Sequence, residues 1–132
     1  MTNIFSYLKD HEQHIFQTVE TLVKAESPSH DKALVDECGQ VLQDLFKEHL
    51  GLTAEVFKQE SAGNHLKFTY GDGDEQILII VHFDTVWDKG RLSLRIDGNR
   101  AYGPGIFDMK SGILLSLWAV KAIKELNILM VV

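Results

Sequence analysis

The residues best suited to chemistry are His82 and Asp84, which directly follow the apolar run 77–81. Five consecutive β-branched or leucine residues are typical of a strand buried on both faces, as in a parallel sheet. Because side chains alternate along a strand, residues 82 and 84 point to the same side, where an imidazole and a carboxylate can converge. The carboxyl end of such a strand is where open α/β sheets bind their ligands.

A third candidate, Asp108, follows the turn sequence Gly103-Pro104-Gly105. The glycines allow a sharp turn where a side chain would clash, and they deliver Asp108 to the start of a predicted helix, where the helix dipole favours a carboxylate. Taken alone, Asp108 has a simpler interpretation as a helix N-cap, and His82 as a hydrogen-bonded structural residue. One histidine and two acidic residues at the ends of different elements favour a metal site.

Zinc suits these donors because it binds neutral imidazole nitrogen and carboxylate oxygen at about 2 Å. His82 is the candidate ligand. Asp84 is either the carboxylate that orients His82 or a contributor to the pKa of a bound water. Asp108 has two oxygens and is therefore suited to bridging two metal ions about 3.5–4 Å apart, an arrangement that positions a water for attack in peptide hydrolysis.

Composition narrows the class of partner. The 132 residues are 45% apolar and 24% charged, the size and balance of one globular domain. A net charge of −6 without a Lys/Arg cluster argues against nucleic acid or an anionic membrane as the main partner, and a cation is the more natural ligand. A Mg²⁺ site for phosphate chemistry is disfavoured, since the sequence has no Gly-rich phosphate loop with a Lys-Ser/Thr pair.

The cellular compartment is predicted from two features, a secretory signal and a membrane-spanning segment, that the sequence lacks. The N-terminus has no basic region followed by a long apolar core, so it is not a secretory signal. No apolar run approaches the ~20 residues that cross a bilayer, and we predict a cytoplasmic protein. The single cysteine, Cys38, excludes an internal disulfide and is predicted to be a small core residue.

The apolar periodicity predicts helices and strands that position the motifs. Helices are expected over about 2–25, 31–50 and from 108 or 109 to 126. Strands are expected over 54–58, 66–70, 76–81 and 128–132, with a small ribbon formed by 92–96 and 100–102. The alternating strand 66–70 is predicted to be the edge neighbour of the buried strand 76–81.

The two motifs together resemble the M20 family of co-catalytic zinc peptidases and deacylases. The residues that carry the resemblance are His82-Phe83-Asp84-Thr85-Val86, Tyr102-Gly103-Pro104-Gly105 and Asp108-Met109-Lys110. The resemblance covers nearly the whole chain and includes Glu26-Ser27-Pro28-Ser29 after the first helix. Within the family the glutamate carboxypeptidase branch is the most similar, because of Trp87 after Asp84-Thr85-Val86 and the Tyr-Gly-Pro-Gly sequence. The implied fold is α/β, a truncated three-layer α/β/α sandwich of the zinc-dependent exopeptidase type.

The resemblance also implies roles and a reaction. His82 would bind one metal, Asp108 would bridge two, and Asp84 would act in catalysis by supporting His82. The cofactor would be Zn²⁺, two ions per complete site, with Co²⁺ or Mn²⁺ as substitutes. The reaction would be hydrolysis of an amide bond in a small peptide or N-acyl amino acid by a metal-bridged hydroxide. A cis peptide is expected at Asp108-Met109, as is common in the family.

Several family features have no counterpart in the sequence. The Asp-Glu-Glu segment, a later acidic residue, a late histidine and the lid or dimerisation domain cannot be matched. We therefore expect residues 1–132 to be the N-terminal portion of the catalytic domain, with the lid domain and the C-terminal catalytic half absent. The isolated chain is expected to be inactive, and the alternative is a non-catalytic folded fragment or a partner-dependent remnant with an incomplete metal site. Self-association through an exposed sheet edge is expected, because apolar residues there lack cover.

Overall fold

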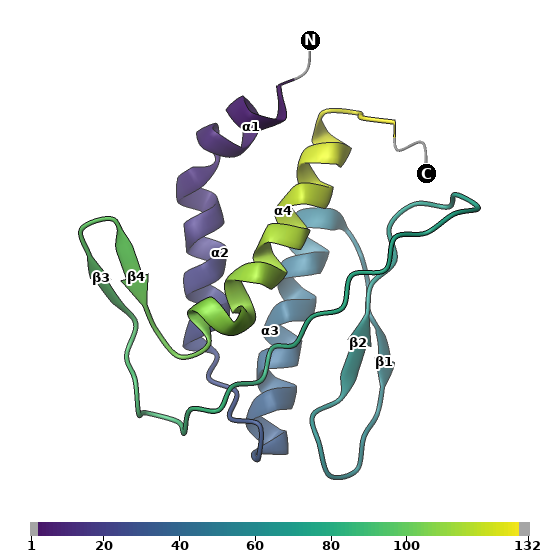
Figure 1. Cartoon of the computed structure of the whole chain (residues 1–132). Coiled ribbons are helices and arrows are strands. Elements are labelled where there is room, and N and C mark those ends of the chain that lie inside the picture. The colour runs from purple at the N-terminus through teal and green to yellow at the C-terminus, as the bar shows by residue number, and fades with distance from the viewer. Residues whose placement is uncertain (1–2, 130–132) are drawn as a thin grey trace.

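The computed structural model describes residues 3–129 as a mixed α and β arrangement. Helices α2, α3 and α4 lie side by side, and two short hairpins extend from them on opposite sides (Figure 1). The helical elements are α1 (Ile4–Asp10), α2 (Glu12–Lys24), α3 (Lys32–Leu50), the five-residue turn η1 (Ile106–Lys110) and α4 (Ser111–Glu125). The strands are β1 (Glu55–Phe57), β2 (His65–Lys67), β3 (Arg95–Asp97) and β4 (Arg100–Tyr102).

The core lies where α2, α3 and α4 meet. Leu22, Leu114 and Leu117 are fully buried there, so the apolar faces predicted from helical spacing are confirmed. Cys38 is buried among them, as predicted. The indole of Trp118 is also buried, and its N–H donates to Thr18 Oγ1 at 3.0 Å, which satisfies the polar atom that burial would otherwise penalise.

The structure confirms the ends of the helix predicted over 31–50 and corrects the helix predicted over 2–25. Helix α3 begins after Asp31, whose side chain accepts a hydrogen bond from Leu34 N, and it ends at Gly51 in the left-handed conformation. The single helix predicted over 2–25 is wrong. His11, with φ −100° and ψ 7°, separates α1 from α2, and its Nδ1 lies 2.7 Å from the carbonyl oxygen of Tyr7.

Both hairpins are antiparallel and short. Val56 lies opposite Leu66 in one, and Ile96 lies opposite Ala101 in the other, so the ribbon predicted before the Gly-Pro-Gly turn is confirmed. The strand predicted over 66–70 is present only as β2, and it pairs with β1. Its predicted pairing with 76–81 is therefore wrong.

The prediction of a buried central strand at 76–81 is also wrong for the described residues. Leu78 and Ile80 are each 82% exposed, and residues 76–81 belong to neither sheet. A strand buried on both faces needs partners on both edges and layers above and below it, and residues 3–129 supply only the two hairpins. The α/β class is confirmed, and the three-layer sandwich stays a prediction.

The segment before α4 also differs from the prediction. The helix expected from residue 108 or 109 begins at Ser111, because Asp108 and Met109 have non-helical backbone angles. In the predicted strand 128–132, residues 128 and 129 are not in a strand, and 130–132 lie outside the described residues. No helix within residues 3–129 has both the length and the apolar character to cross a membrane.

Candidate metal centre

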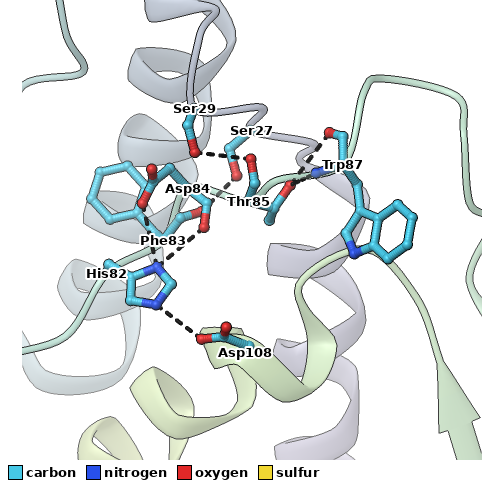
Figure 2. Close-up of polar contacts among 8 residues, drawn as sticks. All are labelled: Ser27, Ser29, His82, Phe83, Asp84, Thr85, Trp87 and Asp108. Atoms are coloured by element: carbon cyan, nitrogen blue, oxygen red, sulfur yellow. Dashed lines mark hydrogen bonds and ion pairs between the residues drawn. The ribbon is translucent and has the colours of Figure 1, made fainter.

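The imidazole of His82 lies against the carboxylate of Asp108. Nε2 of His82 is 3.0 Å from Oδ1 of Asp108, and the two side chains point toward one another from the extended segment after 76–81 and from η1 (Figure 2). Their side chains are 49% and 81% exposed, so solvent and small ligands reach them. The predicted convergence of the two motifs is therefore present.

The other imidazole nitrogen faces Asp84. Nδ1 of His82 is 3.3 Å from Oδ1 of Asp84 and 3.2 Å from its carbonyl oxygen (Figure 2). A carboxylate on each side of the ring defines its orientation. With the proton on Nδ1, this nitrogen donates to Asp84 and leaves Nε2 as the electron-pair donor.

The charges around His82 change its affinity for a proton. Partial burial acts to lower the pKa of His82, but the hydrogen bond with Asp108 and the interactions with Asp84 outweigh it, so the pKa is raised above its ordinary value of 6.5. In the absence of another cation, the two carboxylates therefore favour the imidazolium. A metal ion at Nε2 has to displace this proton.

Two serines after α2 hold the segment that carries His82 and Asp84. Ser27 Oγ donates to the carbonyl oxygen of Phe83 at 2.5 Å, and Thr85 N donates to the carbonyl oxygen of Ser27 at 2.8 Å. Both the N–H and the hydroxyl of Ser29 donate to the carbonyl oxygen of Thr85 at 2.9 Å. We call these contacts the serine clamp, and they attach the candidate site to the helical core. From the sequence, these serines were expected only to follow the first helix as part of the family resemblance, and their contacts were not predicted.

The turn before Asp108 is packed against the clamped segment. Gly105 has φ +72°, and a Cβ atom at this position would lie 2.4 Å from Cγ2 of Thr85. The predicted role of Gly105 in backbone geometry is therefore confirmed. The Asp108-Met109 peptide is cis, as the family resemblance implied. The simpler interpretation of Asp108 as an N-cap is wrong, since Lys110 occupies that position of α4.

A shallow cavity of about 280 Å³ surrounds the pair. Its lining includes Val86, Trp87 and Phe107 beside His82 and Asp108. Trp87 is 42% exposed and lines this cavity. The site therefore combines charged groups with an apolar rim.

The donors fit part of a zinc site. Two ligands of one tetrahedral zinc ion, each at about 2 Å from it, lie about 3 Å apart, close to the separation of Nε2 and Oδ1. A carboxylate on the second nitrogen of a histidine ligand is the usual arrangement around zinc. Within residues 3–129, however, no group of three or more His, Cys, Asp or Glu side chains is placed to hold a metal ion.

Comparison with known proteins shows which family the chain resembles. Residues 78–131, which contain His82, Asp84 and Asp108, match the Peptidase family M20/M25/M40. The chain is also 33% identical over 133 residues to Carboxypeptidase G2 from Pseudomonas sp. (strain RS-16). Both matches support the predicted M20 peptidase family, and the carboxypeptidase-like branch agrees with this relative.

The alignment with Carboxypeptidase G2 covers 95% of this chain and 31% of the relative. The chain thus spans about a third of the length of the curated relative that it matches.

Proposed function

We propose that this chain supplies His82 and Asp108 as ligands of a zinc centre, with Asp84 as the carboxylate that supports His82. The observation that carries the proposal is the imidazole held between two carboxylates, with Nε2 at 3.0 Å from Asp108 and Nδ1 at 3.3 Å from Asp84. An uncharged imidazole fixed in one tautomer is a good zinc ligand. The cavity around the pair leaves space for an ion and a small substrate group.

Each side chain has a distinct role in this proposal. Asp84 accepts a hydrogen bond from Nδ1–H of His82 and thereby keeps the lone pair of Nε2 directed at the ion. Asp108 offers negative charge, and its 81% exposed carboxylate has room to contact a second ion. Zinc, when bound, supplies Lewis-acid polarisation of a carbonyl and a lowered pKa for water. Co²⁺ and Mn²⁺ are the proposed substitutes.

The proposed parent activity is hydrolysis of an amide bond in a small peptide or N-acyl amino acid. Support comes from the match to a peptidase family and from similarity to a carboxypeptidase. The apolar rim of Val86, Trp87 and Phe107 offers a surface for the uncharged part of such a substrate.

We place residues 1–132 in the N-terminal portion of a larger catalytic domain built as a three-layer sandwich. In that domain the exposed run 77–81 would take its predicted place in a central sheet. Support comes from the 82% exposure of Leu78 and Ile80, which is unusual for large aliphatic residues within one apolar run. The isolated chain is proposed to be inactive, since a catalytic zinc centre needs three protein ligands and the described residues supply fewer.

The alternative function is that of a non-catalytic fragment or a partner-dependent remnant. It is favoured by the absence, within residues 3–129, of a complete group of metal-binding side chains. The two proposals differ in zinc binding: the first requires a site that depends on His82 and Asp108, and the second does not.

Zinc titration of the purified chain against a chromophoric chelator distinguishes them. The wild type is compared with His82→Ala and Asp108→Ala, and with the controls His65→Ala and Asp72→Ala, which remove exposed side chains of the same types elsewhere. We expect one weak site whose dissociation constant rises about 10-fold or more in the first two variants and is unchanged in the controls. Wild-type affinity in His82→Ala and Asp108→Ala would refute the ligand assignment. Hydrolysis of an N-acyl glutamate by the wild type would refute the proposed inactivity.

A further inference from the structure

A fully buried lysine lies two residues after Asp108. The side chain of Lys110 has no exposed surface, although lysine is rarely buried in this way. Its Nζ donates to the carbonyl oxygen of Leu22 at 3.1 Å and to that of Ala25 at 2.7 Å. These contacts span 88 and 85 positions of sequence, so they tie η1 to a distant part of the chain.

Burial lowers the pKa of the Lys110 ammonium, and the two backbone acceptors offset part of the cost of burying this cation. Leu22 lies in the last turn of α2 and Ala25 follows its end, where backbone carbonyls have no partner within the helix. The negative end of the helix dipole also favours a positive side chain. The side chain of Lys110 therefore caps the C-terminal end of α2 from another part of the chain.

The segments that contain His82 and Asp108 are both attached to this end of α2. Ser27 and Ser29, just beyond Ala25, form the serine clamp that holds the backbone next to His82. Lys110 holds the backbone next to Asp108, and its own N–H donates to the carbonyl oxygen of Gly105 at 2.9 Å, which closes the turn containing Asp108. The relative placement of His82 and Asp108 is thus defined through one segment, 22–29.

We infer that Lys110 is a positioning residue for Asp108: by fixing η1 to the end of α2, it sets the distance between the Asp108 carboxylate and His82. This inference rests on the proposed metal function. A purely structural role predicts a different result, namely that Lys110 contributes to folding as any buried cap does and leaves the site unchanged.

Helix α4 provides a matched control for that distinction. Lys121 has an 18% exposed side chain, and its Nζ donates to the carbonyl oxygen of His49 in the last turn of α3 at 3.3 Å. Lys121 therefore makes the same kind of contact, from the same helical region to the end of a helix, but away from the candidate site. Replacing either lysine by methionine removes the charge and keeps most of the aliphatic stem.

The test compares Lys110→Met, Lys110→Arg and Lys121→Met with the wild type in the 132-residue chain. We expect Lys110→Met to raise the zinc dissociation constant about 10-fold or more, the usual effect of losing a group that orients a ligand. Lys110→Arg, which retains a cation and donors, should recover most of that loss, and Lys121→Met should leave zinc affinity at the wild-type value. Unchanged affinity in Lys110→Met, or equal weakening in both methionine variants, would overturn the inference.

A metal-free measurement separates failure of this inference from failure of the proposed function. The NMR chemical shifts of the His82 ring are compared between the wild type and Asp108→Asn at one fixed pH. The difference shows how these signals change when the carboxylate partner of His82 is altered. Lys110→Met should displace these signals in the same direction, and Lys121→Met should not. If the wild type binds no zinc, the proposed function fails and this comparison still decides whether Lys110 positions Asp108.

If Lys110→Met does not fold, a second variant tests the inference. Lys110→Gln keeps one donor group without the charge, and an osmolyte such as trimethylamine N-oxide favours its folded state. We expect Lys110→Gln to bind zinc more weakly than Lys110→Arg. Equal affinity of the two variants and the wild type would overturn the inference.

Discussion

Nε2 of His82 lies 3.0 Å from Oδ1 of Asp108, although 26 positions separate the two residues. Neither residue belongs to a β-sheet of the described chain. The serine clamp holds the first, and Gly105 and Lys110 hold the turn of the second, so the pair is positioned by the end of α2. The geometry of the site therefore depends on the helical core.

Replacing Asp108 by asparagine should lower the pKa of His82. Burial alone acts to lower this pKa, and the hydrogen bond with Asp108 is the largest single contribution that opposes it, so its loss leaves burial opposed by Asp84. NMR titration of the His82 ring in wild type and Asp108→Asn measures the change. Asp72→Asn, in an exposed loop, is the control. A pKa of His82 that is equal in all three proteins would contradict the contact.

Replacing Gly105 by alanine should disturb the site more than the same change at Gly98. Both glycines have left-handed angles, φ +72° and φ +60°, but an added Cβ meets Thr85 only at Gly105 and has open space at Gly98. We expect Gly98→Ala to cost about 1 kcal/mol of unfolding free energy from backbone strain, and Gly105→Ala to cost more. Urea unfolding gives both values, and zinc affinity should fall in Gly105→Ala alone. Equal losses in the two variants would show that the contact with Thr85 has no effect.

Removing the hydroxyl of Ser27 should loosen the attachment of the site. Ser27→Ala leaves the partly buried carbonyl oxygen of Phe83 without this donor, at an expected cost of about 1–3 kcal/mol. Ser116→Ala is the control, since the Ser116 hydroxyl donates only to a carbonyl of its own helix, Gly112 O. Urea unfolding and zinc titration of both variants test the effect. A loss in Ser27→Ala no larger than in Ser116→Ala would refute the importance of the clamp.

Adjacent leucines of α4 should differ strongly in their contribution to stability. Leu114 is fully buried and Leu115 is 69% exposed. Leu114→Ala is expected to lower the unfolding free energy by about 2–5 kcal/mol because it leaves a cavity in the core. Leu115→Ala should change it by about 0.5 kcal/mol or less. Similar values from chemical denaturation would show that the orientation of α4 is wrong.

The exposed run 77–81 should cause the chain to self-associate. An extended apolar segment that belongs to no sheet of the described residues is a template for pairing with a second copy of this chain. Sedimentation velocity at increasing protein concentration should show association that Ile79→Lys reduces. Phe5→Lys, which replaces a 73% exposed residue of α1, should leave it unchanged. A monomer at every concentration would contradict this prediction.

Local sequence signals were sufficient for the helical core and for the choice of site residues. The spacing of Leu22, Leu114 and Leu117 defined buried faces that the structure confirms, because helical periodicity depends only on near neighbours. His82 and Asp108 were predicted to lie together because imidazole and carboxylate groups both bind zinc. Whether these residues bind zinc stays a prediction.

The errors arose where structure depends on distant contacts. An apolar run such as 77–81 indicates a buried strand only if partners exist, and the periodicity of the run says nothing about them. The contacts of Ser27 and Lys110 join segments 56 and 85 positions apart, so no local pattern could predict them. The position of Lys110 at the start of an apolar helix was the sequence feature that could have indicated its burial.

X-ray absorption spectroscopy at the zinc edge tests the central claim most directly, because it reports the atoms around the ion itself. The zinc-loaded wild type should show nitrogen and oxygen neighbours at about 2.0–2.2 Å with the outer-shell scattering of one imidazole. That imidazole signal should vanish in His82→Ala and persist in His65→Ala. An unchanged imidazole signal in His82→Ala would show that His82 is not the ligand and would contradict the account of the site.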